Sequence, residues 1–115
     1  MELGPHHRFL GDALLALAEI SWDQKGKSEA ERYMHAAIAH ELALGGRNGG
    51  FYGSNLLVLA GWLDSEGRVA EAYAAIREVR EIAAETDVFS DEGVAEIKKR
   101  YLSIRKKIKE NIKLV

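Results

Sequence analysis

The chain of 115 residues contains no cysteine and only one proline, Pro5. Without cysteine, neither a disulfide nor a thiolate-metal bond can hold the fold, so packing must supply the stability. The most apolar stretch, residues 13–20, is far shorter than the roughly 20 residues that span a bilayer. Residues 1–9 lack the apolar run of a secretory signal. We therefore expect no membrane segment and a cytoplasmic location.

Sequence signals for β-strands are also missing. No long run alternates valine, isoleucine and threonine with polar residues. The Asn48-Gly49 pair lies in the glycine-rich stretch 45–50, between segments rich in alanine, leucine and glutamate. Such a stretch is typical of a connection between helices. The fold class that we predict is all-α.

Apolar residues instead recur at steps of three and four along most of the chain, as they do on one face of a helix. Ser28 and Glu31 have the spacing of an N-terminal capping box. Gly67 is typical of a helix C-terminus, and Ser90 or Asp91 can cap the last helix. Five helices are predicted, at residues 7–24, 28–44, 51–66, about 69–87 and 91–112.

Each predicted helix has one apolar stripe that we expect to be buried. With 47% hydrophobic and 30% charged residues, the composition is that of an ordinary globular domain, and its length suffices for one core. The expected stripes are Leu10, Leu14, Leu17, Ala18 and Ser21; Ala30, Tyr33, Met34, Ala37, Ile38 and Leu42; Leu56, Leu59, Ala60 and Leu63; Val69, Ala72, Ile76, Val79 and Ile82; and Val94, Ile97, Tyr101, Ile104 and Ile108.

An internal repeat is visible by subtraction. Each copy reads as two large apolar residues, a small residue, a polar turn and a second small residue. We expect the alanines where two helices approach closely, because a larger side chain there would cost about 1–3 kcal/mol through overpacking. The matching residues, each shifted by 42, are Leu14, Leu17, Ala18 and Ala30 in the first copy and Leu56, Leu59, Ala60 and Ala72 in the second.

These residues resemble the tetratricopeptide repeat, whose pattern is Leu-x-x-Leu-Ala followed by Gly-x-x-x-x-Ala. In the first copy, Gly26 stands one place later than the pattern requires, so we expect an irregular turn there. The step of 42 resembles the longer repeats of kinesin light chains and of many bacterial regulators. The second copy fits the pattern fully, with Leu56, Leu59, Ala60, Gly67 and Ala72.

The resemblance implies one domain, residues 1–115, that is a right-handed α-solenoid of two helical hairpins, about residues 7–44 and 51–87, and a C-terminal capping helix, about 91–112. Two repeats are few, because each hairpin leaves an apolar face that a neighbour must cover. The last helix, with a lysine-rich outer face, is similar to the solvating helix of the family. The N-terminal face has no obvious cap, so we expect further repeats upstream or pairing with a second copy.

The same resemblance implies a concave groove, lined by the first helix of each hairpin, that holds a peptide or helix of a partner protein. No cation occurs at the matching positions, which disfavours a clamp for a C-terminal carboxylate and favours a basic or amphipathic partner segment. Trp22 is either a binding anchor or packs between repeats, and Trp62 is expected to be structural. The implied groove residues are Asp12, Leu15, Ala16, Glu19, Trp22 and Asp23, and Ser54, Leu57, Val58, Gly61, Asp64 and Ser65.

The sequence offers little for catalysis or metal binding. His35 and His40 are five residues apart and so lie on different faces of a helix, and we expect them, like His6 and His7, to be ordinary surface residues. The stretch 45–50 lacks the Lys-Ser or Lys-Thr of a phosphate-binding loop, and no serine stands in a nucleophile elbow. We predict no enzyme activity, no cofactor and no metal.

The formal charge of -2 is unevenly distributed. Residues 1–90 carry 8 basic and 14 acidic side chains, whereas residues 91–115 carry 8 basic and 4 acidic ones. A basic helix can bind nucleic acid or an acidic partner, but the acidic body would repel a phosphate backbone. The main prediction is a scaffold for protein–protein interaction; self-association is the alternative, and binding of nucleic acid or an acidic partner through the last helix is the weaker one.

Overall fold

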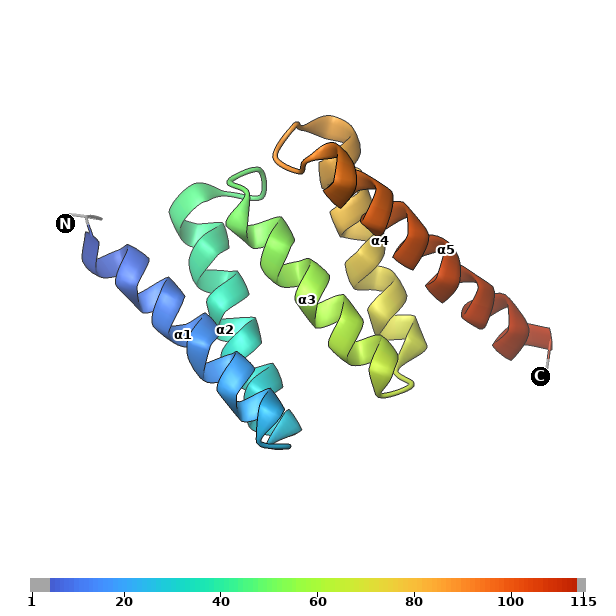
Figure 1. Ribbon diagram of the computed structural model, residues 1–115, viewed down its shortest axis with the longest axis horizontal. Helices are drawn as coiled ribbons and strands as arrows, with labels where there is room; N and C mark the ends of the chain where they lie inside the picture. Colours follow the sequence, from blue (N-terminus) through green and yellow to red (C-terminus); the bar gives the residue numbers. More distant parts are fainter. Residues whose placement is uncertain (1–4, 114–115) are drawn as a thin grey trace. The chain divides into compact units, whose positions relative to one another are not determined.

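The computed structural model describes the backbone of residues 5–113 and the side chains of residues 9–112. Over this range the chain forms α-helices and no strand, so the all-α prediction is confirmed (Figure 1). The chain divides into two compact units, Met1–Asn55 and Leu56–Val115, with the boundary inside the third helix. The helices are α1 (Pro5–Asp23), α2 (Lys27–Gly45), α3 (Phe51–Ser65), α4 (Val69–Glu85) and α5 (Asp91–Lys113).

Helix ends differ from the predicted ends by at most two residues. The predicted capping box is wrong, because α2 begins at Lys27 and no side chain caps it at Gly26. Ser28 and Glu31 therefore lie inside the helix. The cap predicted for α5 is confirmed at Ser90, whose Oγ accepts a hydrogen bond from the amide of Gly93 at 3.1 Å.

The turns that end α1 and α3 contain the same hydrogen bonds, 42 residues apart. In the first turn the amide of Gly26 donates to the carbonyl of Ser21 at 2.8 Å, and the amide of Lys25 donates to that of Trp22 at 3.1 Å. This pair of bonds is the Schellman motif of helix C-termini. The second turn repeats it from Arg68 to Leu63 and from Gly67 to Asp64, both at 3.0 Å.

Each turn also needs one residue with a positive φ. In the second turn this residue is Gly67, with φ 75°, and in the first it is Lys25, with φ 66°. A side chain in the left-handed region costs about 1–2 kcal/mol, which glycine avoids. The irregular turn predicted from the displaced Gly26 is therefore wrong, because the backbone is regular and Lys25 carries the strain.

Small residues lie where the repeat predicts close packing. Ala18, Ala30, Ala60 and Ala72 are each 0% exposed. Within the first unit α1 packs against α2, and a Cβ added to Gly11 would come within 2.6 Å of a side-chain oxygen of α2. Alanine and glycine permit this approach because they add little volume between helix axes. The solenoid arrangement of the two hairpins stays a prediction.

Most of the predicted apolar stripes are buried, but four residues are exposed. On α2 the buried face runs from Ile38 to Glu41 by a step of three, so Glu41 is buried and Leu42 is exposed. On α1 only Ala18 is fully buried among the five expected residues. The exposed residues that were expected to be buried are Leu10, Leu17, Leu42 and Val94.

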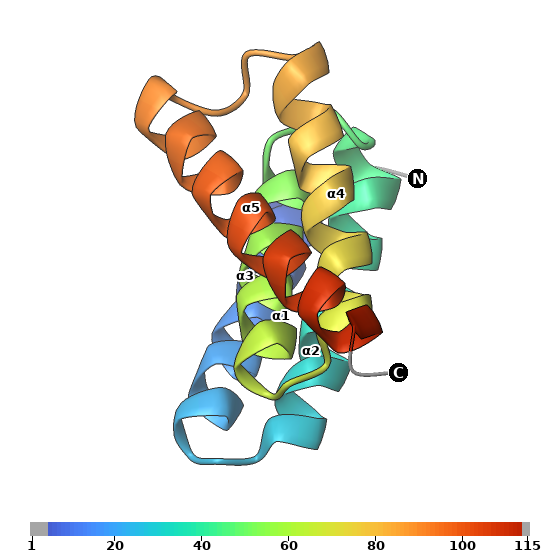
Figure 2. The same ribbon diagram turned by 90° about the vertical axis from the view of Figure 1, so that its right-hand side faces the viewer.

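Within the second unit, α4 and α5 run in opposite directions and pack against each other (Figure 2). The rings of Tyr73 and Tyr101 stack between them with centroids 5.8 Å apart, and their hydroxyl oxygens are 3.5 Å apart. Burial of aliphatic side chains stabilises the two helices by removing apolar surface from water. Their large buried aliphatic residues are Ile76, Val79 and Ile82, and Ile97 and Ile104.

Candidate functional site

Half of the predicted site residues lie on α1, in the first unit. Asp12, Ala16, Glu19 and Asp23 are exposed. They follow one another at steps of four, three and four, so they form one row along the helix. The row presents three carboxylates to solvent. The two remaining residues of this set, Leu15 and Trp22, are half-buried.

Trp22 is already in contact with a side chain of its own hairpin. The ammonium of Lys27, the first residue of α2, lies 4.9 Å from the centroid of a Trp22 ring. A cation over an indole face at this distance is attracted by the ring quadrupole. Lys27 therefore contributes to holding Trp22 in this orientation. Its role as a partner anchor stays a prediction.

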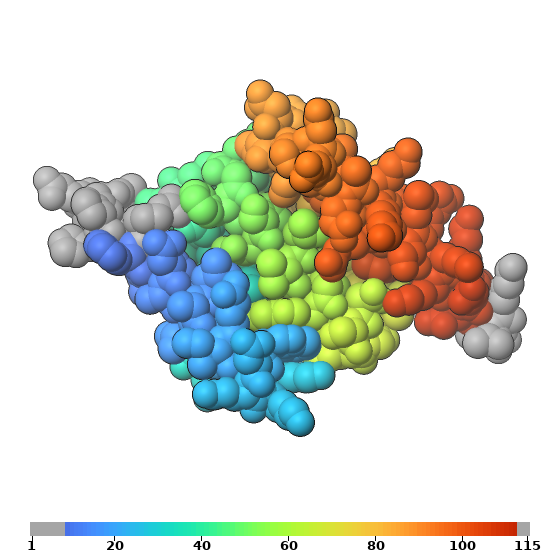
Figure 3. Space-filling view, viewed as in Figure 1, coloured from blue at the N-terminus to red at the C-terminus, as the bar shows by residue number. Residues whose placement is uncertain are grey.

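Next to the acidic row, α1 exposes large apolar side chains. Phe9 is 70% exposed and Ile20 is 53% exposed, and Leu10 and Leu17 are also exposed. Exposed apolar side chains grouped on one side of a helix mark an interaction site more often than scattered single residues do. In Figure 3 α1, drawn in blue, lies at the surface. The solvent side of α1 is thus apolar along one edge and acidic along the other.

The second predicted set lies on α3 and is divided by the boundary between the units. Ser54 and Ser65 are exposed, and their hydroxyls donate to helix carbonyls, that of Ser54 to Gly50 at 3.0 Å and that of Ser65 to Trp62 at 2.7 Å. Both hydroxyls therefore already have an acceptor. A single groove lined by this set and the α1 set stays a prediction. The half-buried members of the set are Leu57, Val58, Gly61 and Asp64.

Within the second unit, two cations of α5 lie beside the predicted residues of α3. Lys107 Nζ is 2.8 Å from Asp64 Oδ1. A Cβ added to Gly61 would lie 2.7 Å from Arg100 Nη1, and Arg100 Nε donates to Glu96 at 3.0 Å. The surface around Gly61 and Asp64 is therefore not free of cations. Sequence reasoning missed this, although Arg100 and Lys107 are seven residues apart and so share one side of α5.

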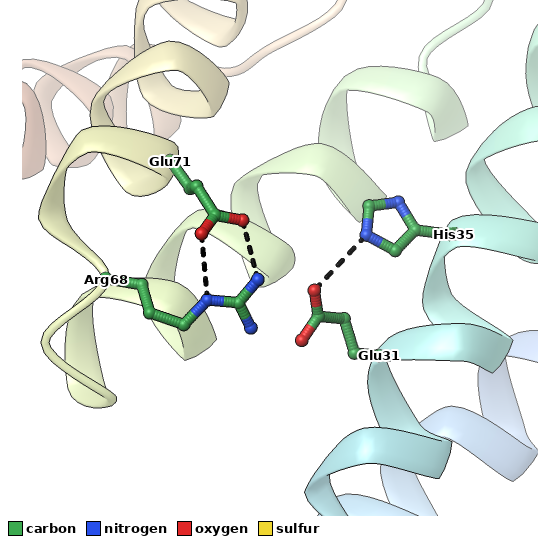
Figure 4. Close-up of polar contacts among 4 residues, drawn as sticks. All are labelled: Glu31, His35, Arg68 and Glu71. Carbon is green, nitrogen blue, oxygen red and sulfur yellow. Dashed lines mark hydrogen bonds and ion pairs between the residues drawn. The ribbon is translucent and has the colours of Figure 1, made fainter.

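Other charged contacts are local pairs on helix surfaces (Figure 4). Glu71 accepts two hydrogen bonds from Arg68, at 3.1 and 2.6 Å, at the start of α4. On α2, His35 Nε2 lies 3.5 Å from Glu31 Oε1, an ion pair only when the imidazole is protonated. Pairs at such spacings stabilise a helix by about 0.2–0.5 kcal/mol each. These contacts support the helices.

No group of three histidine or carboxylate side chains that could hold a metal ion occurs within the part of the chain that the structure describes. The side chains of His6 and His7, which the sequence analysis considered, lie outside the described residues. Across residues 5–113, none of the helices combines the length and the apolar character needed to cross a bilayer.

A scan against protein-family models, a search of curated proteins and a search of solved structures each found no match to this chain. The resemblance to the tetratricopeptide repeat therefore depends on the repeated residues alone. It stays a prediction.

Proposed function

We propose that this protein is a non-catalytic scaffold of the tetratricopeptide type that binds a basic, amphipathic segment of another protein. The proposal includes the predicted right-handed α-solenoid of two hairpins, with α5 as its capping helix. The two Schellman turns and the buried alanines, repeated at a step of 42, support a duplicated hairpin.

The observation that carries the proposed function is the two-sided solvent face of α1. Its carboxylates, Asp12, Glu19 and Asp23, lie along one edge. Phe9 and Ile20 expose apolar surface beside them. A partner helix with leucines on one face and lysines at its border would cover the apolar surface and face the carboxylates. Complementary charge would fix its orientation and speed its association.

A peptide titration tests this proposal. The probe is a fluorescein-labelled synthetic helix of lysine, leucine and alanine, with leucines at steps of three and four, and the matched peptide carries glutamate in place of lysine. Fluorescence anisotropy with the full chain should show binding of the lysine peptide only. The triple variant Asp12→Asn, Glu19→Gln, Asp23→Asn should raise the dissociation constant about tenfold or more.

A control variant separates the α1 surface from net charge. It neutralises three exposed carboxylates of the second unit and should bind the lysine peptide within about twofold of the unchanged chain, since these carboxylates are not part of the α1 surface. If the control weakens binding as much as the α1 variant does, or if the lysine peptide does not bind, the assignment is wrong. The control substitutions are Glu66→Gln, Asp87→Asn and Glu110→Gln.

Self-association through paired α1 helices is a second candidate, favoured by one difference in burial. Leu17 is 43% exposed, whereas its counterpart Leu59 in the second repeat is 3% exposed. A second α1 covering Leu17 would remove this difference. Sedimentation at high micromolar concentration should then show dimers that Leu17→Ser dissociates and that Leu42→Ser, at a residue 45% exposed, leaves intact. A strict monomer excludes this candidate.

A further inference from the structure

The second unit contains a shallow groove between α4 and α5. It consists of two neighbouring hollows of about 260 and 330 Å³ that share Arg80 and Ala84. Ala83, Val94 and Ile97 line the first hollow. Because Ile97 is buried while Ala84 and Val94 are exposed, the groove has an apolar floor that is open to solvent.

Cations border this floor. Lys98 lines the first hollow, and Arg80, which lines both, lies 4.3 Å from the centroid of the Tyr101 ring. Among the side chains that the structure describes, neither Lys98 nor Arg80 forms an ion pair. Glu81, which lines the second hollow, pairs with Arg77 at 3.8 Å. The rim therefore has an excess of positive charge.

The ionisation of Tyr101 is consistent with a positive potential at the groove. The hydrogen bond with Tyr73 lowers the pKa of the Tyr101 phenol, and burial acts in the opposite direction. The guanidinium charges of Arg80, Arg105 and Arg77 lower this pKa further. Cations lower the pKa of a phenol because they stabilise the phenolate. The same cations would attract carboxylates of a ligand.

The solvent face of α1 has the complementary character. Its carboxylates, Asp12 and Glu19, are exposed and lie seven residues apart, about two helical turns. Ala16, between them in the row, is also exposed. Ile20 offers apolar surface next to Glu19. α1 is thus an acidic, amphipathic helix of the kind that the α4–α5 groove suits.

We infer that α1 of one copy docks into the α4–α5 groove of a second copy. Its carboxylates face Arg80 and Lys98, and Ile20 covers Val94. This inference rests on the proposed role of α1 as the binding helix, and it names the partner as the chain itself. The apolar floor favours an amphipathic helix over nucleic acid, because contact with alanine and valine does not stabilise a bound phosphate.

The two docking surfaces differ, so the contact is head-to-tail. A single such contact leaves one α1 and one groove unoccupied, so further contacts can form until the assembly closes or extends as a filament. The average mass should therefore rise with concentration. Added salt should weaken it, because part of the attraction is between partly exposed charges.

Charge reversal in the full chain tests the inference by sedimentation velocity from low to high micromolar concentration. The head variant, Asp12→Lys with Glu19→Lys, makes α1 basic, and the tail variant, Arg80→Glu with Lys98→Glu, makes the groove acidic. Each variant alone should associate at least about tenfold more weakly than the unchanged chain. An equal mixture of the two should associate again, because basic α1 then faces an acidic groove and acidic α1 faces a basic one.

Recovery in the mixture cannot come from misfolded variants, and matched controls exclude an effect of net charge. Glu66→Lys with Glu110→Lys, and Lys99→Glu with Lys106→Glu, change the charge equally at exposed residues outside both surfaces and should associate like the unchanged chain. Three results would overturn the inference: a monomeric unchanged chain, a tail variant that associates normally, or a mixture that does not recover.

The same experiments distinguish this inference from the proposed function. A monomeric chain that still binds the lysine peptide through α1 would overturn head-to-tail assembly and leave the proposed function intact. A monomeric chain that binds a synthetic helix of glutamate, leucine and alanine through Arg80 and Lys98 would overturn the inference by assigning the groove to another protein.

Discussion

The first helices of the two repeats, α1 and α3, carry the same pattern and end in the same turn, yet their apolar residues differ in exposure. The turns agree in hydrogen bonds and in the backbone angles that follow, with φ -85° and ψ 62° at Gly26 and φ -85° and ψ 65° at Arg68. Leu17 is nevertheless 43% exposed, whereas its counterpart Leu59 is 3% exposed. The turn geometry therefore follows from the backbone hydrogen bonds within each turn, whereas burial depends on what lies against the helix.

This difference extends along both helices. At two of the four matched places α3 has a larger or more apolar side chain, which gives more area to remove from water, and at the other two both helices have leucine. The counterparts in α1 are exposed or half-buried. The pairs, each 42 apart, are Leu10 and Tyr52, Leu14 and Leu56, Leu17 and Leu59, and Ser21 and Leu63.

The largest effect that we predict is at these leucines. Leu59→Ala should lower the free energy of unfolding by about 2–5 kcal/mol, because it removes buried methyl groups and leaves a cavity. Leu17→Ala should cost about 1 kcal/mol or less, because much of the side chain already contacts water. Urea titrations followed by circular dichroism measure both. Equal losses would show that the two repeats have equivalent surroundings in solution.

A smaller effect is expected in the two turns, which share one backbone geometry but have different residues at the positive φ, Lys25 and Gly67. Gly67→Ala should destabilise the chain by about 1 kcal/mol, since it places a Cβ in the left-handed region. Lys25→Gly should stabilise it by about 0.5 kcal/mol. Glycine relieves the backbone strain of the folded state, and the greater entropy of the unfolded chain offsets part of that gain. Thermal unfolding measures both. Gly45→Ala, at a residue without a positive φ, is the control and should not destabilise.

The smallest effects are expected at two lysines that contact equivalent positions, Trp22 and Asp64. Lys107→Gln should cost about 0.2–1 kcal/mol at low salt, as exposed ion pairs do, and almost nothing in about 1 M salt. Lys27→Gln should cost about 0.5–1 kcal/mol through the lost contact with the indole. Urea unfolding at two salt concentrations tests this, with Lys99→Gln as the control. If the stability lost in Lys107→Gln did not depend on the salt concentration, the ion pair with Asp64 would be contradicted.

The helices were predictable from sequence because helical spacing and terminal signals depend on residues within one or two turns. The capping box at Ser28 failed because the N-cap lies two residues earlier, at Gly26, with a backbone geometry that needs no side-chain cap. On α1 the spacing predicted a stripe at Leu10 and Leu17, but spacing alone does not say whether anything covers a stripe. The exposure of these leucines was therefore mispredicted.

The candidate site was predictable only in part. The acidic row on α1 follows from helical spacing and is exposed as expected of surface carboxylates. The contact of Lys107 with Asp64 joins residues 43 apart in the chain, and the α4–α5 groove joins two helices whose packing angle the spacing does not fix. The residue pattern of a single helix predicts neither this contact nor this groove.

The sequence by itself determined the five helices, the helix end at Gly67 and the four buried alanines. These features depend on backbone hydrogen bonds and side-chain volumes within short segments. Only the tertiary structure decided that Leu17 is exposed while Leu59 is buried, and that Lys107 reaches Asp64. Burial and charge contacts of this kind depend on which helices pack together, and that depends on the free energy of the whole chain rather than on any one segment.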